Sequence, residues 1–262
     1  MKKLLSCFCI LVLFSQCSSE PKQKGFSVHT ESPEESGETE EQKGLNSDSL
    51  NLDTRPGGVL ISGYPQFRLI PIYLLNAEAY RGKLKYFSGS NAFHHSYGTI
   101  GRNDSNNWHS NYMPGFTAMY GYNLLNMQLH DVHTKGSHAF FENPVLIKTV
   151  YFPAFSKDTL NGRAVKRDYY MVSAYNEDSN QDQYINSSDL RRFFRFDLHG
   201  KSLGPLIPLN YSVRSSQYDP ANDYMYVYAA EDEDNNGRIE AKEKVKVFWI
   251  DLNNPKLRGL MF

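Results

Sequence analysis

Cysteine is nearly absent from this chain of 262 residues, and its three cysteines all lie at or before residue 17. The rest of the chain therefore has no thiol. This distribution excludes a disulfide framework, a zinc site with cysteine ligands and a cysteine nucleophile from residues 18–262.

An excess of charge is also absent, because 28 lysines and arginines nearly balance 29 aspartates and glutamates, for a formal net charge of −1. Proteins whose main task is to bind nucleic acid usually carry a marked basic surplus, so we expect no nucleic-acid partner. The balance conceals an uneven distribution. Residues 18–53 carry nine acids and three lysines, a net −6, and Lys2 and Lys3 add +2, which leaves +3 for residues 54–262.

Long apolar runs are missing too, except for the 12 residues from Leu4 to Ser15. A helix that spans a bilayer needs about 20 apolar residues, so this run is too short to be one. It follows Lys2 and Lys3, and a short apolar run behind a basic start is typical of a signal peptide. We therefore expect the chain to be exported.

The end of the apolar run, Leu13-Phe14-Ser15-Gln16-Cys17, resembles the signal of bacterial lipoproteins, in particular those of Bacteroidota. Gln16 departs from the small residue that usually precedes the cysteine. The resemblance implies that residues 1–16 are removed and that Cys17 carries the lipid anchor. It implies a location in the bacterial cell envelope, at the outer membrane, with the membrane as a partner. The alternative is an ordinary secretory signal with a chance cysteine.

Residues 17–54 are rich in Ser, Glu, Pro, Gly, Lys and Gln and contain few apolar residues. Such a segment cannot bury enough surface to offset the entropy lost on ordering. We expect a disordered acidic tether that leads to a single domain, residues 55–262.

The domain itself is predicted to be all-β, because aromatic and β-branched runs alternate with Gly, Asn, Asp and Pro. With 18 Tyr and 16 Phe, the chain has ample residues for such strands. The predicted strands are Phe67–Leu75, Asn123–His133, Val145–Phe152, Tyr169–Tyr175, Phe193–Leu198, Tyr224–Ala230 and Val245–Leu252.

Two segments, at about 170–200 and 224–254, align at an offset of 54 residues. Tyr170-Met171 aligns with Tyr224-Met225, and Asp197-Leu198 aligns with Asp251-Leu252. Each segment has the same order of strand, acidic loop and strand, which indicates one supersecondary unit used twice.

The end of each unit, such as Phe196-Asp197-Leu198-His199-Gly200-Lys201, also resembles the outer hairpin of TolB-like β-propeller blades. A period near 50 residues suits four-stranded blades, either four of them or an incomplete propeller. The resemblance implies antiparallel sheets with repeated strand–loop–strand units. An antiparallel β-sandwich is the alternative.

The second acidic loop, residues 232–243, resembles the 12-residue calcium loop of EF-hands, D-x-[DN]-x-[DN]-G followed by a closing Glu. The ligand positions 1, 3, 5, 7, 9 and 12 are Asp232, Asp234, Asn236, Arg238, Glu240 and Glu243. Position 7 binds through its backbone carbonyl, which is why Arg238 is compatible with the site. Gly237 permits the turn at position 6, and Ile239 at position 8 anchors the loop.

The first acidic loop, residues 178–189, has the same spacing with two departures. Its ligand positions are Asp178, Asn180, Asp182, Tyr184, Asn186 and Asp189. Gln183 replaces the glycine at position 6, and Asp189 is one methylene shorter than the usual Glu. We expect two Ca²⁺ sites, with weaker binding in this loop than in residues 232–243. The alternative is a pair of solvated turns rich in Asn and Asp.

Strand-like sequences flank both loops, so the helix opening of EF-hand sensors is not expected to apply. The sequence predicts a calcium-stabilised β-domain with a binding or scaffolding role toward a protein or glycan. The alternative is a calcium-stabilised periplasmic or surface enzyme that acts on glycans. Its cleft is then expected in residues 88–115, which hold His94, His95, Asp104 and His109. No catalytic residue is assigned.

Overall fold

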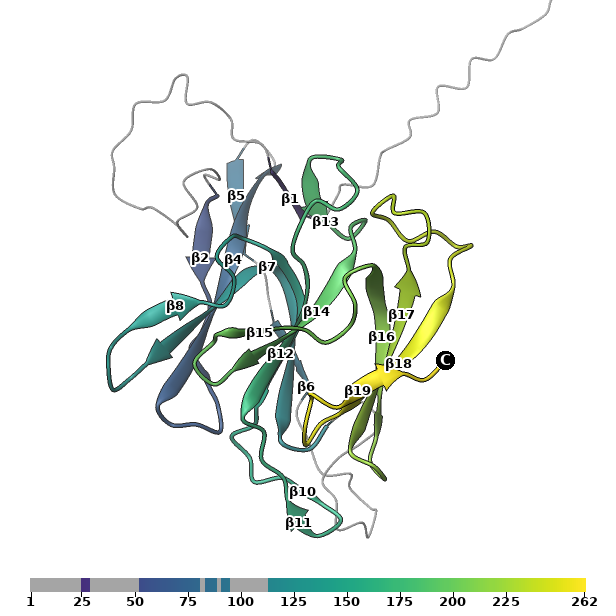
Figure 1. Cartoon of the computed structure of the whole chain (residues 1–262). Coiled ribbons are helices and arrows are strands. Elements are labelled where there is room, and N and C mark those ends of the chain that lie inside the picture. The colour runs from purple at the N-terminus through teal and green to yellow at the C-terminus, as the bar shows by residue number, and fades with distance from the viewer. Residues whose placement is uncertain (1–24, 29–51, 81–82, 89–90, 95–112) are drawn as a thin grey trace, which may run out of the picture.

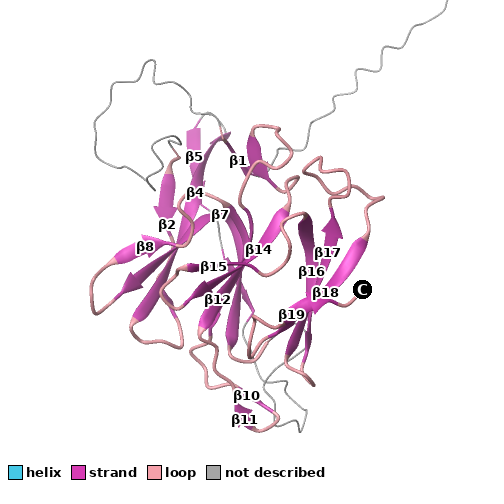
Figure 2. Ribbon diagram, in the orientation of Figure 1, coloured by secondary structure: helices cyan, strands magenta, loops and turns pink. Residues whose placement is uncertain are grey.

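The computed structural model of the chain describes residues 25–28, 52–80, 83–88, 91–94 and 113–262. Within these ranges all helix or strand elements are β-strands, and the paired strands are antiparallel (Figure 2). This confirms the expected all-β class. No helix in the described ranges is long and apolar enough to cross a membrane. The predicted signal peptide, residues 1–16, and Cys17 lie outside these ranges.

The larger sheet has 11 strands and is built around two long strands, β4 (Phe67–Tyr80) and β7 (Phe116–Asp131). From β7 it continues through β9 (Leu146–Pro153), β12 (Tyr169–Tyr175), β14 (Arg191–Asp197) and β15 (Ser202–Pro205). Short strands pair with β4, namely β2 (Thr54–Pro56), β3 (Leu60–Ile61) and β5 (Lys83–Ser88). Two others, β6 (Asn91–His94) and β8 (Ser137–Ala139), pair with β7. A separate hairpin joins β10 (Thr159–Leu160) to β11 (Arg163–Ala164).

The smaller sheet is a four-stranded meander of β16 (Tyr211–Asp219), β17 (Tyr224–Glu231), β18 (Val245–Asp251) and β19 (Arg258–Leu260). The larger sheet contains a similar meander of four neighbouring strands in chain order, β9, β12, β14 and β15. The equivalent strands β14 and β18 are offset by 54 residues at both ends. The predicted repeat of strand, acidic loop and strand is thus present in the fold. The described strands form this meander twice, and they do not form a ring of four separate blades.

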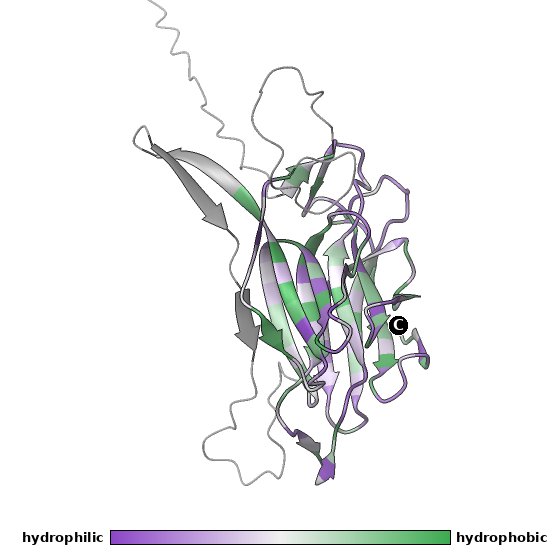
Figure 3. Ribbon diagram, turned by 90° about the vertical axis from the view of Figure 1, so that its left-hand side faces the viewer, coloured by the Kyte–Doolittle hydropathy of each residue, from purple (hydrophilic) through white to green (hydrophobic). Residues whose placement is uncertain are grey.

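The main core lies between the two sheets. Phe116, Met171 and Phe193 of the larger sheet belong to one buried cluster with Val227 and Ile250 of the smaller sheet. The larger sheet is buried on both faces at its centre, because consecutive residues of β12 enter different clusters: Met171 faces the smaller sheet, and Tyr170 and Val172 belong to a second buried cluster with Phe67 and Phe196. Figure 3 shows hydrophobic and hydrophilic residues mixed along the strands of the domain. The packing of the two sheets positions the loops at their ends.

The seven predicted strands are all present, and most differ from expectation only at their ends. β12 has the predicted bounds, whereas β7 begins at Phe116 instead of Asn123 and β4 continues to Tyr80. β16 is missing from the prediction because residues 214–217 in its middle are polar and exposed. Such a stretch lacks the apolar alternation by which a half-buried strand is recognised.

One part of the predicted disordered tether is instead a strand. Gly25–Ser27 forms β1, which pairs with β13 (Tyr184–Asn186) inside the first acidic loop. Phe26 is only 4% exposed and belongs to a small buried cluster with Leu74, Leu125 and Ile185. The prediction of disorder is wrong for residues 25–28. The composition of the whole segment is polar, and it does not reveal that the single aromatic side chain, Phe26, is buried against the domain.

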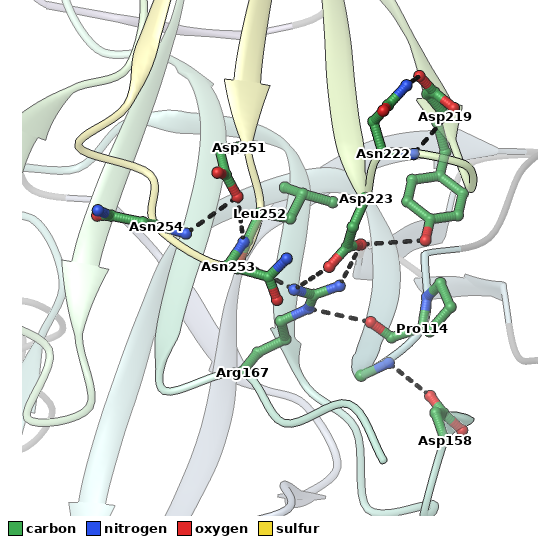
Figure 4. A network of polar contacts seen from close by, with 12 residues as sticks. Pro114, Asp158, Arg167, Asp219, Asn222, Asp223, Asp251, Leu252, Asn253 and Asn254 are labelled. Atoms are coloured by element: carbon green, nitrogen blue, oxygen red, sulfur yellow. Dashed lines mark hydrogen bonds and ion pairs between the residues drawn. The ribbon is translucent and has the colours of Figure 1, made fainter. Parts of the chain in front are cut away.

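A buried ion pair connects the loop before β12 with the smaller sheet (Figure 4). The Arg167 guanidinium contacts both carboxylate oxygens of Asp223, at 2.7 and 2.9 Å, and the Arg167 side chain is 1% exposed. It also donates to the carbonyls of Leu252 at 2.9 Å and Pro114 at 3.1 Å, and the Tyr218 hydroxyl donates to Asp223 at 3.0 Å. The network satisfies a charge pair that would otherwise be costly to bury.

Candidate metal centre

The two acidic loops lie at the same end of the two sheets, in the upper part of Figure 1. Residues 178–189 connect β12 to β14, and residues 232–243 connect β17 to β18. Because each loop joins neighbouring antiparallel strands, both ends of each loop are held by a ladder of backbone hydrogen bonds. The two loops have the same internal geometry.

In both loops the aspartate at position 1 accepts hydrogen bonds from the backbone N–H groups of positions 5 and 6. The Asp178 carboxylate accepts from Asp182 at 3.0 Å and from Gln183 at 2.8 Å. The Asp232 carboxylate accepts from the N–H groups of Asn236 and Gly237, both at 3.0 Å. These bonds wrap the backbone around the carboxylate.

The oxygens at positions 3 and 5 continue the same pattern. The side-chain oxygen at position 3, from Asn180 or Asp234, accepts from the N–H of position 5 at 2.9 or 3.3 Å. The oxygen at position 5 accepts from the N–H of position 7, which is Tyr184 or Arg238, at 3.0 or 2.9 Å. Successive Asx turns thus curve each loop so that alternate side chains point inward.

The backbone dihedrals agree as well. Position 4 has a φ of 58° at Gln181 and 55° at Asn235, and position 6 has 72° at Gln183 and 73° at Gly237. Positive φ is the left-handed region that glycine tolerates best. Gln183 therefore adopts the conformation of its glycine counterpart at a cost in stability, as its sequence position predicts.

The carboxylate at position 12 closes each loop on the backbone. Asp189 accepts from the N–H of Asn186 at 2.8 Å and from that of Ser179 at 3.0 Å. Glu243 accepts from the N–H groups at the equivalent positions, from Glu240 at 2.7 Å and from Glu233 at 3.2 Å. The shorter Asp189 side chain reaches the same two partners, so both loops have the same closure.

The second loop gathers three carboxylates that could hold a metal ion. Ligand atoms of Asp232, Asp234 and Glu243 lie within 4.8 Å of one another, and Asp232 and Glu243 are 5% and 7% exposed. Two unit charges about 4 Å apart repel by about 4 kcal/mol at an effective dielectric of 20, so the cluster favours a cation. Lys242 supplies part of the countercharge from the surface, at 3.3 Å from Asp234. Carboxylate and carbonyl oxygens are the ligands that Ca²⁺ prefers.

The first loop does not bring three carboxylates as close together, and the second loop holds the only such group among the described residues. Positions 3 and 9 of the first loop are the amides Asn180 and Asn186, so these positions carry no negative charge. Burial is the main cause that raises the pKa of the Asp189 carboxyl, and the charges of Asp178 and Asp182 raise it further. The first loop therefore has the same frame as the second with fewer charges in it.

The two loops touch each other, which the sequence does not indicate. The Ser179 hydroxyl donates to the carbonyl of Gly237 at 2.7 Å and accepts from the N–H of Leu190 at 2.8 Å. A Cβ atom at Gly237 would lie 1.8 Å from the Ser179 carbonyl oxygen. Gly237 is therefore required both for its positive φ and for the close approach of the two loops.

A buried arginine, also missed from the sequence, lies near both loops. Arg192 in β14 is 6% exposed and contacts Glu177 at 2.9 Å. Burial is the main cause that lowers the pKa of Arg192, and the negative charges of Glu177, Asp232 and Asp189 oppose it. Arg192 thus provides one fixed positive charge that stabilises carboxylates from both loops. In the sequence it is one of two adjacent arginines in a strand, with no signal that marks it.

The other candidate region, residues 88–115, is mostly outside the described ranges. His94 is the last residue of β6, whereas His95, Asp104 and His109 fall among the residues that are not described. The cleft expected for the enzyme alternative therefore lies mostly outside the described residues.

No protein-family profile matches the chain, and a search of curated proteins gave no significant match.

Proposed function

We propose that the chain is a calcium-binding protein of the bacterial cell envelope, in which calcium fixes the ends of a β-domain that serves binding or scaffolding. The observation that carries the proposal is the repeated frame of the two loops. Backbone hydrogen bonds at equivalent positions, equal φ angles and a closing carboxylate occur in both. Solvated turns of unrelated origin have no reason to agree at so many positions.

Two calcium ions are proposed, one in each loop. The second loop is the tighter site, because it combines three converging carboxylates with glycine at position 6. The first loop offers amide oxygens at two ligand positions and has a strained residue at position 6. Both features weaken its binding of calcium. Sites of this kind in extracellular proteins bind at about 10⁻⁴–10⁻³ M.

Calorimetric titration with CaCl₂ tests the proposal, with the full mature chain and two variants. Asp232→Asn removes the tighter phase and Asp178→Asn removes the weaker one. Glu233→Gln is the matched control, because it removes the same charge from position 2 of the second loop and leaves the ligands intact. No heat from the wild type, or equal loss from Glu233→Gln and Asp232→Asn, contradicts calcium binding at these loops.

The lipid anchor is proposed separately, from the resemblance of residues 13–17 to lipoprotein signals. Cys17→Ser is expected to move the protein from the membrane fraction to the soluble fraction of an expressing bacterium, whereas Cys9→Ser leaves it on the membrane. A wild-type protein that is already soluble contradicts the anchor and leaves the calcium proposal untouched.

A further inference from the structure

A cavity of about 550 Å³ lies between the two acidic loops, beside strand β16. Its walls are residues 187–189 of the first loop, residues 238–240 of the second loop and residues 212–214 of β16, with Tyr175 and Arg191. The cavity is therefore built by the ends of both loops, but it is separate from the carboxylate cluster that faces the proposed metal. Three of its lining residues, Asp189, Arg238 and Glu240, also occupy ligand positions of the proposed calcium sites, whereas the arginine side chains have no role there.

Three arginines line this cavity, one from each of three chain segments: Arg191 from β14, Arg214 from β16 and Arg238 from the second loop. None of them forms an ion pair with a carboxylate in the described part of the chain. Like charges gathered without an ion-pair partner favour an anionic ligand.

Two acids also lie on the cavity wall, but both have other partners. The Asp189 carboxylate accepts from backbone N–H groups of its own loop. Glu240 contacts Lys242 at 3.1 Å. In the calcium-loaded protein of the proposed function both acids also face a cation, so the arginines are the charges that an incoming ligand meets.

Arg191 has an unsatisfied donor at this place. Its Nη2 donates to the carbonyl of Arg214 at 2.7 Å, whereas its Nε is buried and has no hydrogen-bond partner among the described residues. Burial, together with the charge of Arg214, lowers the pKa of Arg191. The Nε has almost no exposed surface, so a ligand reaches it only if the Arg191 side chain shifts. The planar fork of arginine matches carboxylate and sulfate oxygens.

The remaining polar groups on the wall are hydroxyls, from Ser187, Ser188, Ser212 and Tyr175. We propose that the cavity binds an acidic saccharide, with its carboxylate or sulfate group against the three arginines and its hydroxyls against the serines. The volume suits one or two sugar units, and the mix of arginine, serine and tyrosine provides both charge and neutral hydrogen bonds. The site is thus a saccharide-binding site placed between two metal-binding loops.

Titration of the full mature chain in CaCl₂ with D-galacturonate, D-galactose and sodium sulfate tests this inference. Galacturonate is expected to bind in the millimolar range or tighter and galactose not measurably, because galactose lacks the carboxylate. Binding of galacturonate is expected to weaken as salt screens the arginines. Equal binding of the two sugars, or tighter binding of sulfate than of galacturonate, would overturn the saccharide assignment.

Arg214→Ala is the main variant, because Arg214 is exposed and its loss leaves the fold intact. Removal of one charged donor is expected to weaken galacturonate binding about tenfold. Arg163→Ala is the matched control, since Arg163 is also an exposed arginine but lies on β11, which does not line the cavity. An equal effect of the two variants places the binding outside the cavity and overturns the inference.

The same titrations separate this inference from the calcium proposal. Heat with CaCl₂ but none with galacturonate refutes the saccharide site and leaves calcium binding intact. Binding of galacturonate by a chain that gives no heat with CaCl₂ refutes the calcium proposal and supports the saccharide site on its own.

Discussion

At the scale of single residues, the two loops differ most informatively at position 6. Gln183 has a φ of 72° and an exposed side chain, so its conformation is unfavourable and no packing compensates for it. Gln183→Gly is expected to raise the free energy of unfolding by about 1 kcal/mol, because the left-handed region costs a residue with a Cβ atom roughly that amount. Urea denaturation in EDTA measures this effect without the metal. A loss of stability would contradict it.

Gly237 differs from Gln183 because its position is limited by space as well as by φ. Gly237→Ala is expected to lower the free energy of unfolding by more than Gly162→Ala does. Gly162 has nearly the same φ, 71°, but nothing lies within 4 Å of a Cβ atom placed there. The difference between the two variants in urea denaturation therefore isolates the contact of Gly237 with Ser179. Equal losses would show that the two loops do not touch in solution.

Residue spacing alone predicts the turns of both loops, because Asp, Asn and Gly have preferred places in Asx turns, and the ligand positions stay a prediction. It does not predict Ser179 or Arg192, whose importance comes from contacts across the two repeats. Such contacts join positions far apart in the sequence, such as Ser179 and Gly237, and neither position carries a local signal.

At the scale of elements, strand β1 ties the N-terminal segment to the first acidic loop. Phe26 pairs with Ile185 at position 8 of that loop, and the N–H of Val28 donates to the carbonyl of Gln183 at 2.9 Å. Deletion of residues 18–28, with Cys17 joined to residue 29, is therefore expected to weaken calcium binding in the first loop. The second loop, which β1 does not contact in the described pairing, is expected to keep its affinity.

Calorimetric titration of this deletion variant in CaCl₂ measures both sites. Phe26→Ser is the companion variant, since it keeps the chain length and removes only the buried side chain. Hydrogen exchange is expected to show faster exchange at Tyr184–Asn186 in both variants. An unchanged weaker site together with unchanged exchange would contradict a role for β1 in that loop.

The sequence predicts strands whose apolar residues are continuous or alternate, such as β12 and β17. The strands that it misses are short or polar, and β1, β15, β16 and β19 are among them. Edge strands and docked segments obtain most of their stability from the sheet or pocket that receives them. Their own composition therefore resembles that of a loop.

At the scale of the whole molecule, the two sheets are joined by the core between them and by the Arg167–Asp223 pair. Composition and strand pattern predict the all-β class, and the 54-residue offset predicts the two repeated units. The sequence does not predict that one of these units joins the long strands β4 and β7 in an 11-stranded sheet. Pairing between strands far apart in the chain produces no repeated pattern in the sequence.

Removal of both charges of the buried pair is expected to cost less than the two single removals added together. Asp223→Asn keeps the side-chain shape at a position with a φ of 56°, which Asn tolerates, but leaves the Arg167 guanidinium without its countercharge. A loss of about 3–5 kcal/mol in the free energy of unfolding is expected. In the double variant Arg167→Met with Asp223→Asn no buried charge is left unpaired, so its loss is expected to be smaller than the sum of the two single losses. Urea denaturation of all three variants in EDTA measures the coupling. Additive losses would show that the two groups do not interact as a pair and that the core alone holds the two sheets together.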